Sequence, residues 1–216
     1  MENSKRLNVQ KKNFDKNGFL IIRNALSRTE IELYNLCIDK LYLDKKELIL
    51  KRPFSVGLDW KNIVSEDHNF INLIDHPSTF SIVLKLLGYH IQLAMSHAII
   101  RPPGDHFKGF IHTDGGQAMR KIEYSSKGLN FQIKVQYFLT DVKEKDSGNF
   151  IYFPGSHKNY FDESKENEYL MSNALKQLKV NAGDVVIFSH LLWHGATINR
   201  SLTERKSLVF VTINYL

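Results

Sequence analysis

The chain has 216 residues, of which 43% are hydrophobic and 24% are charged, and its formal net charge is +6. These proportions are typical of a globular protein, and the length suffices for one well-buried domain, 1–216, without requiring a second. No apolar run approaches the ~20 residues of a membrane span, and no apolar signal-peptide core follows the polar start, so we expect a cytoplasmic protein with no membrane partner. A single cysteine, Cys37, excludes an internal disulfide, and the helical pattern around it predicts a packed core thiol.

The basic residues are spread among acidic ones, with no run of five or more. This distribution argues against nucleic acid as a partner, because such proteins concentrate their positive charge in a patch or stripe. The excess charge instead leaves open a small-molecule substrate that is anionic or linked to an acidic carrier.

Helical signals dominate residues 1–90, which we interpret as a helical layer with the first strand. Residues 1–13 are polar and are expected to be frayed, and Gly18 to Ile22 reads as a short strand. The pattern Ser27-x-x-Glu30 is a capping box that opens an amphipathic helix to about Leu43. Residues 44–70 give no clear assignment. A second helix is predicted from Pro77 to Leu87, where Gly88 stops it.

From Ile91 onward the periodicity changes to that of strands separated by glycine-containing turns. Helices followed by a run of strands predict a mainly β fold, with residues 91–216 as its core. The segment Asn130 to Leu139 alternates clearly, with Gln132, Lys134 and Gln136 on one side and apolar residues on the other.

A metal-binding pattern lies within this predicted β-core. His112 and Asp114 are two residues apart, so in extended chain they share one face, and His194 follows another predicted strand. Two histidines and one carboxylate form the facial triad that leaves coordination positions of Fe(II) open. Arg205 follows His194 by eleven residues and supplies a planar fork of donors suited to a carboxylate; Ser207 shares its face.

With these motifs in order, the sequence resembles the phytanoyl-CoA dioxygenase-like family of Fe(II)- and 2-oxoglutarate-dependent oxygenases. The resemblance runs from Phe14-x-x-x-Gly18-Phe19 through Tyr137 to Val142, Gly148-Asn149-Phe150 and Pro154-Gly155-Ser156-His157-Lys158 to Asn199-Arg200-Ser201. It implies a double-stranded β-helix, also called a jelly-roll or cupin-like core. It also implies an enzyme that couples oxidative decarboxylation of 2-oxoglutarate by O2 to oxidation of a second substrate. The expected reaction is hydroxylation, desaturation or cyclisation at an unactivated C–H bond, and halogenation is not expected because Asp114 is present.

The resemblance also suggests residues for binding the co-substrate. It favours the polar face of 130–139 as a lining of the barrel, which makes Lys134 a candidate second cation near 2-oxoglutarate. It places the predicted strand from Ile91 to Arg101 beside the pocket, so His97 is a candidate donor to 2-oxoglutarate or substrate. The polar segment Gly115 to Gly128 starts beside a metal ligand and is predicted to be a lid, with Gln117, Arg120 and Lys121 reaching the substrate.

Two alternatives remain open: a non-catalytic cupin-like binding protein, and a zinc enzyme on the same fold. Zinc prefers a closed tetrahedron, or three protein ligands and one water. Arg205 discriminates between the readings, because a zinc hydrolase has no need of a carboxylate clamp on that strand.

Overall fold

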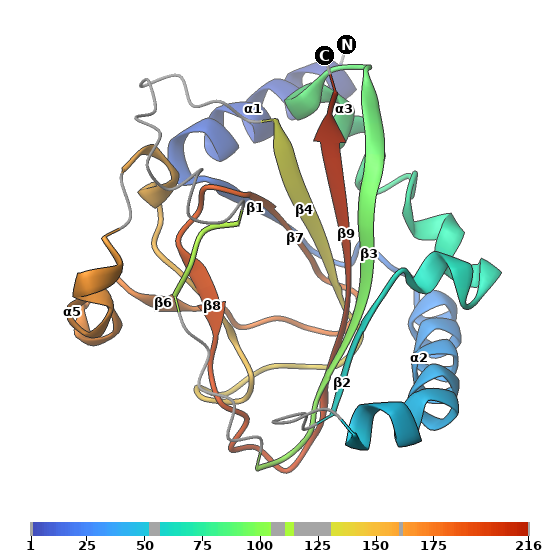
Figure 1. The fold of residues 1–216 in the computed structure, drawn as a ribbon. Helices are drawn as coiled ribbons and strands as arrows, with labels where there is room; N and C mark the ends of the chain where they lie inside the picture. Colours follow the sequence, from blue (N-terminus) through green and yellow to red (C-terminus); the bar gives the residue numbers. More distant parts are fainter. Residues whose placement is uncertain (1, 52–56, 105–110, 115–130, 160–161, 216) are drawn as a thin grey trace.

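The computed structural model describes residues 2–51, 57–104, 111–114, 131–159 and 162–215 (Figure 1). The α-helices are α1 (Glu2–Asn17), α2 (Arg28–Leu50), α3 (Phe80–Leu87) and α5 (Glu166–Met171), and short 3-10 helices cover Ile63–Ser65, His68–Leu73, Ser156–Lys158 and Glu163–Lys165. The strands are β1 (Phe19–Ile22), β2 (Leu58–Lys61), β3 (Ile91–Arg101), β4 (Gln132–Phe138), β5 (Phe150–Tyr152), β6 (Lys176–Gln177), β7 (Val185–Ser189), β8 (His194–Ala196) and β9 (Arg205–Asn214).

The strands form two antiparallel sheets. The large sheet has the order β1-β7-β4-β9-β3-β2, and the small sheet has the order β6-β5-β8. Figure 1 shows β6 and β8 across the interior from β4, β9 and β3, with α2 outside the large sheet. Two antiparallel sheets that face one another, with helices on an outer face, confirm the predicted jelly-roll class.

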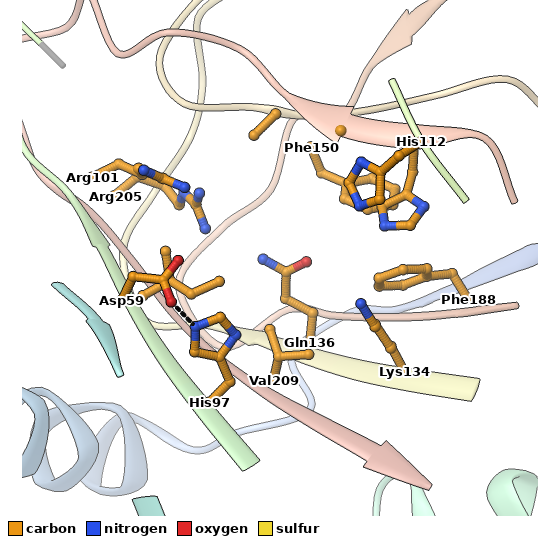
Figure 2. A pocket seen from close by; sticks show the side chains of 14 residues that line it. Asp59, His97, Arg101, His112, Lys134, Gln136, Phe150, Phe188, Arg205 and Val209 are labelled. Atoms are coloured by element: carbon orange, nitrogen blue, oxygen red, sulfur yellow. Dashed lines mark hydrogen bonds and ion pairs between the residues drawn. The ribbon is translucent and has the colours of Figure 1, made fainter. Parts of the chain in front are cut away.

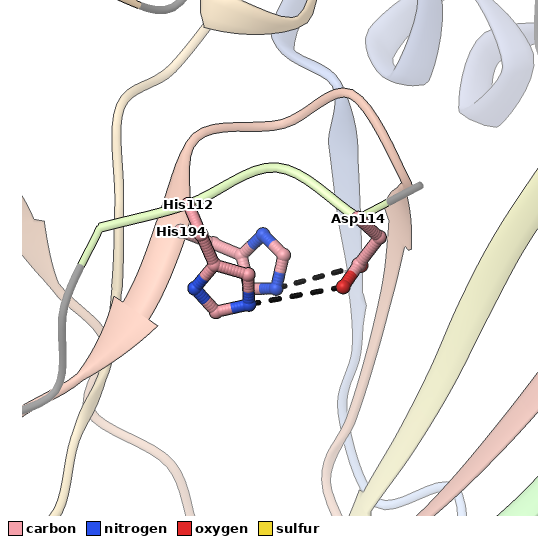
Figure 3. A group of neighbouring side chains, drawn as sticks. All are labelled: His112, Asp114 and His194. Atoms are coloured by element: carbon pink, nitrogen blue, oxygen red, sulfur yellow. Dashed lines mark ion pairs between the residues drawn. The ribbon is translucent and has the colours of Figure 1, made fainter. Parts of the chain in front are cut away.

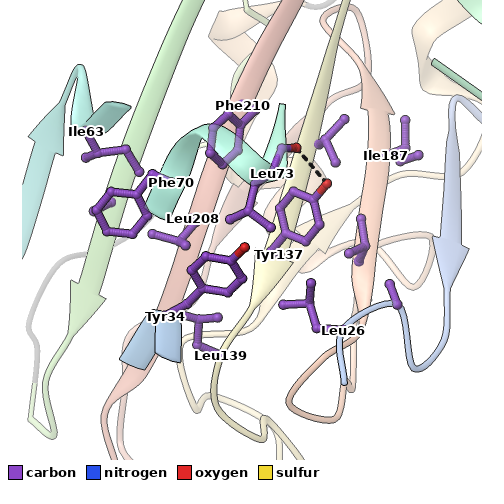
Figure 4. Packing of buried hydrophobic residues seen from close by; sticks show 14 of the residues in the cluster. Leu26, Tyr34, Ile63, Phe70, Leu73, Tyr137, Leu139, Ile187, Leu208 and Phe210 are labelled. Atoms are coloured by element: carbon purple, nitrogen blue, oxygen red, sulfur yellow. Dashed lines mark hydrogen bonds between the residues drawn. The ribbon is translucent and has the colours of Figure 1, made fainter. Parts of the chain in front are cut away.

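Helices α2 and α3 pack on the outer face of the large sheet because each presents apolar residues to it. Tyr34 and Ile38 of α2, together with Phe70, pack with Tyr137 and Phe210 from the sheet, and all five are at most 2% exposed (Figure 4). The hydroxyl of Tyr137 lies 2.8 Å from Thr79 Oγ1 and donates to the Leu73 carbonyl at 3.0 Å, which satisfies a polar group that burial would otherwise penalise. The opposite face of the sheet is therefore left to line the interior of the barrel.

Several local predictions can be compared with the structure. The capping box is confirmed, since the Glu30 amide donates to Ser27 Oγ and the Glu30 carboxylate accepts from the Ser27 amide, but the helix continues to Leu50. Cys37 is buried, as expected. The expectation of a frayed start is wrong, because α1 spans Glu2–Asn17. Phe14 anchors it at 0% exposure in the core, a tertiary contact that its polar sequence does not reveal.

The segment 1–90 contributes two strands rather than one. β1 pairs with β7 at one edge of the large sheet, and β2 pairs with β3 at the other edge. β2 comes from the segment that gave no clear assignment, and it brings Asp59 beside β3. Across the described ranges, no helix is long and apolar enough to cross a membrane.

Candidate metal centre and co-substrate cavity

Two histidines meet across the edge of the small sheet. His112 forms an antiparallel bridge with His194 of β8, and each amide donates to the carbonyl of the other, at 2.9 and 3.0 Å. Cross-strand partners project to the same side of a sheet, and the two ring centroids are accordingly 4.4 Å apart. The bridge between these distant segments therefore directs both imidazoles toward one point, as Figure 3 shows.

The His194 ring is held in a form that can bind a metal ion. Its Nδ1 lies 2.7 Å from the Leu192 carbonyl, which can only accept, so Nδ1 carries the hydrogen and Nε2 keeps its lone pair. Burial lowers the pKa of His194 to about 3, because the desolvated charged form is disfavoured. The ring is thus neutral at physiological pH, as a metal ligand must be.

Asp114 completes the cluster. Its amide donates to the His190 carbonyl at 2.7 Å, which fixes the turn, and its carboxylate faces both rings. Oδ1 lies 3.7 Å from His112 Nε2, and Oδ2 lies 3.6 Å from His194 Nε2. One potential ligand atom from each of the three residues lies within 4.8 Å of the others. Asp114 Oδ2 is buried and accepts no hydrogen bond from any described residue, so it is an acceptor that a metal ion would satisfy.

Lys134 of β4 touches this cluster. Its Nζ donates to Asp114 Oδ1 at 2.6 Å, and the two side chains are 16% and 12% exposed. Burial by itself raises the pKa of the Asp114 carboxyl, but the electrostatic influence of the facing His194 ring and of the Lys134 ammonium holds that pKa below its ordinary value. Asp114 is therefore ionised. Its Oδ1 is engaged by Lys134, so Oδ2 is the carboxylate oxygen that would be offered to a metal ion.

The inner face of the large sheet lines a cavity of about 220 Å³ that extends from these histidines. Lys134 and Gln136 point into it, whereas Ile133, Val135 and Tyr137 pack into the core, as the alternation of β4 predicted. Figure 2 shows His112 at one end of the cavity and Arg205 at the other. The remaining lining residues are Asp59, His97, Ile99, Arg101, Phe150, Phe188, His194, Gly195, Ala196 and Val209.

Arg205 and Ser207 form a polar group at the end away from the histidines. Arg205 is 4% exposed, and its Nη1 donates to Ser207 Oγ at 2.6 Å. The same oxygen accepts from Gln136 Nε2 at 3.1 Å. This end can thus receive a carboxylate, while the histidine end can receive a metal ion. The predicted roles of Arg205 and Ser207 toward 2-oxoglutarate remain predictions that this geometry supports.

The structure adds partners that sequence reasoning did not find. His97 lines the cavity, but its Nε2 bonds to Asp59 Oδ1 at 2.7 Å, and Asp59 lay in the unassigned segment. Arg101 also lines the cavity. It lies four residues after His97 on the same strand, so the period of two could have placed both side chains on one face. Phe150 and Phe188 pack on His194, with centroids 5.7 and 4.8 Å from its ring. The predicted substrate residues Gln117, Arg120 and Lys121, with the proposed lid, lie outside the described residues.

These features define the class of jelly-roll oxygenases that bind a metal ion and a dicarboxylate in one barrel. A sequence profile described as Phytanoyl-CoA dioxygenase (PhyH) matches residues 14–207. The chain therefore belongs to the phytanoyl-CoA dioxygenase family and is an Fe(II)- and 2-oxoglutarate-dependent dioxygenase, as its motifs predicted.

Individual relatives are distant. The dioxygenase cdmD of Talaromyces verruculosus is 26% identical over 156 residues, which are 69% of this chain and 49% of that protein. HygX of Streptomyces hygroscopicus, crystallised with nickel and 2-oxoglutarate, is 18% identical over 96% of this chain and 87% of its own, with a TM-score of 0.78. The carbocyclase SnoK from nogalamycin biosynthesis is 20% identical over 95% and 83%, with a TM-score of 0.74. The two structures support the fold.

Proposed function

We propose that this dioxygenase hydroxylates an unactivated C–H bond of a small molecule, or desaturates or cyclises such a molecule, as a step in a biosynthetic pathway. One observation carries the proposal. The His112, Asp114 and His194 cluster opens onto the same cavity whose far end holds Arg205. A cavity with a metal site at one end and a guanidinium at the other fits a dicarboxylate that binds the metal and the arginine together.

The comparisons support a small-molecule substrate. A crystal structure of HygX contains hygromycin B together with nickel and 2-oxoglutarate, and its TM-score to this chain is 0.71. SnoK is described as a carbocyclase of nogalamycin biosynthesis. The net charge of +6 makes an anionic or carrier-linked substrate the natural first choice in a screen.

The residues have distinct roles in this proposal. His112, Asp114 and His194 would hold the iron, which supplies redox and O2 chemistry that side chains lack. Arg205 and Ser207 would bind the distal carboxylate of 2-oxoglutarate and set its orientation. Phe150 and Phe188 would exclude water from the side of the cavity next to His194.

The test is an anaerobic titration of the protein with Fe(II) and then 2-oxoglutarate, followed by visible absorption. We expect a metal-to-ligand charge-transfer band that requires both additions, and succinate release once O2 and a suitable metabolite are supplied. Asp114→Ala should abolish the band and the turnover. Asp44→Ala, which removes an exposed carboxylate from α2, serves as the matched control and should change neither.

The opposite result has a clear meaning. Tight zinc binding with no charge-transfer band and no succinate would favour the zinc enzyme. Binding of a small molecule without any metal requirement would favour the cupin-like binding protein. Full activity of Asp114→Ala would remove the basis of the proposal.

A further inference from the structure

The solvent-facing side of α2 carries a row of leucines. Leu36, Leu43 and Leu50 follow one another at intervals of seven residues, and their exposed fractions are 71%, 67% and 68%. Seven residues are about two turns of an α-helix, so the three side chains lie one after another along about 21 Å of the helix. Single exposed apolar residues are ordinary on a protein surface, but a row of large ones marks an interaction surface.

This leucine row is separate from the face that holds α2 on the sheet. The buried residues Tyr34 and Ile38 are each two residues from Leu36, which places them about 200° around the helix from it. Figure 1 shows α2 at the periphery of the molecule, outside the large sheet. The helix is therefore apolar on two opposite sides, and the leucine row is the side that stays exposed to solvent.

Charged residues beside the leucine row fit a second, antiparallel copy of the same helix. Lys40 lies three residues before Leu43 and Glu47 lies four residues after it, about 4.5 and 6 Å along the helix axis. When two copies pack antiparallel with a two-fold axis at Leu43, Lys40 of each copy reaches the level of Glu47 of the other, on the same flank of the row. Lys46 lies on the opposite flank, at the level that Asp39 of the other copy reaches. A parallel arrangement would instead place like charges together.

We propose that the leucine row of α2 is an interface between two copies of this chain, packed antiparallel about a two-fold axis at Leu43. A two-fold interface is formed by the same surface of both copies, so Leu36 meets Leu50 of the other copy and Leu43 meets its own counterpart. Association removes the leucines from water and pairs each Lys40 with a Glu47. One helix from each copy makes a small interface, so the dimer should dissociate on dilution.

The first test is the oligomeric state of the 216-residue chain, followed by sedimentation equilibrium over about a hundredfold range of micromolar protein concentrations. We expect a reversible equilibrium between monomer and dimer. Leu43→Lys removes two leucines from the interface and places two ammonium groups at the axis, so it should raise the dimer Kd roughly a hundredfold. Leu202→Lys is the matched control, because Leu202 is 95% exposed but lies outside α2, and this variant should dimerise like the unmodified protein.

Charge reversal tests the pairing of Lys40 with Glu47. Lys40→Glu and Glu47→Lys should each weaken the dimer, because each substitution brings two like charges together across the interface. The double variant should recover the affinity of the unmodified protein, because the pair is restored with its signs exchanged.

Cysteine crosslinking tests the register of the two helices. On air oxidation, Leu43→Cys should form disulfide-linked dimers, because the two new thiols meet at the axis. Leu36→Cys and Leu50→Cys should form linked dimers only when the two variants are mixed. The unmodified chain, whose single cysteine Cys37 is buried, is the control and should not crosslink.

A chain that stays monomeric over the whole concentration range, without crosslinking of Leu43→Cys, overturns the inference and leaves this face to a different protein. A dimer that Leu43→Lys does not weaken also overturns it, because the contact then uses another surface. Neither result affects the proposed function, since the described residues that line the cavity include none from α2.

Discussion

Replacing Lys134 with methionine should destabilise the metal-free protein and make its stability depend on added metal. Lys134 Nζ lies 2.6 Å from Asp114 Oδ1, and the two side chains are 16% and 12% exposed. Removing one partner of a buried ion pair costs ~3–5 kcal/mol, because the other charge stays desolvated and uncompensated. The remaining exposure of both groups places our expectation at the lower end, about 3 kcal/mol of unfolding free energy. The neutral His194 ring cannot replace the lost cation.

The measurement is urea unfolding of metal-free protein, repeated with excess Ni²⁺. Bound metal supplies a new counter-charge for Asp114, so the deficit of Lys134→Met should shrink when Ni²⁺ is present. Lys11→Met is the matched control, because Lys11 pairs with Asp15 at 2.8 Å but the side chains are 40% and 45% exposed. That exposed pair should contribute less than about 1 kcal/mol. A Lys134→Met protein as stable as the Lys11→Met protein, with no added benefit from Ni²⁺, would refute the reasoning.

Three further predictions concern the end of the cavity that holds Arg205 and the pH dependence of folding. Gly148 has φ +73°, and an added Cβ would lie 3.3 Å from Arg205 Cβ, so Gly148→Ala should lower the unfolding free energy by about 1–2 kcal/mol and weaken 2-oxoglutarate binding. Gly104→Ala, at φ +72° with nothing within 4 Å, should show the same strain with unchanged binding; if both variants bind equally well, the contact with Arg205 is irrelevant. Arg205→Lys keeps the charge but loses the planar fork of donors, so it should raise the 2-oxoglutarate Kd roughly tenfold in calorimetry. An unchanged Kd would show that another residue binds the distal carboxylate. Burial lowers the pKa of His157 to about 4 in the folded protein, whereas the unfolded chain has the ordinary value of about 6.5. Between these two pH values the unfolded chain binds more protons than the folded protein, so the unfolding free energy should fall as pH drops from about 6.5 toward 4. His157→Gln should flatten that part of the curve in urea unfolding at stepped pH, and identical curves would contradict the assignment.

The sequence alone singled out His112 and Asp114 as a pair of candidate metal ligands because their relation is local. His112 and Asp114 share a face through a spacing of two, and a period of two is a property of extended backbone wherever it lies. The same periodicity separated Lys134 and Gln136 from Ile133 and Val135. The capping box at Ser27 and Glu30 is likewise a matter of neighbouring residues, and the structure reproduces its hydrogen bonds.

Tertiary structure decided every relation that depends on register or on distant packing. Arg101 and Arg205 are separated by more than a hundred residues, and a shift of one residue between β3 and β9 would turn one of them away from the cavity. Asp59 lies at the cavity because β2 pairs with β3. Phe14 packs in the core and thereby stabilises α1, although most of that segment is polar. Periodicity states which residues lie on the same face of an element. The total burial of apolar surface over the whole chain decides which face points inward and which residue lies opposite on the neighbouring strand. A local sequence pattern does not contain that information.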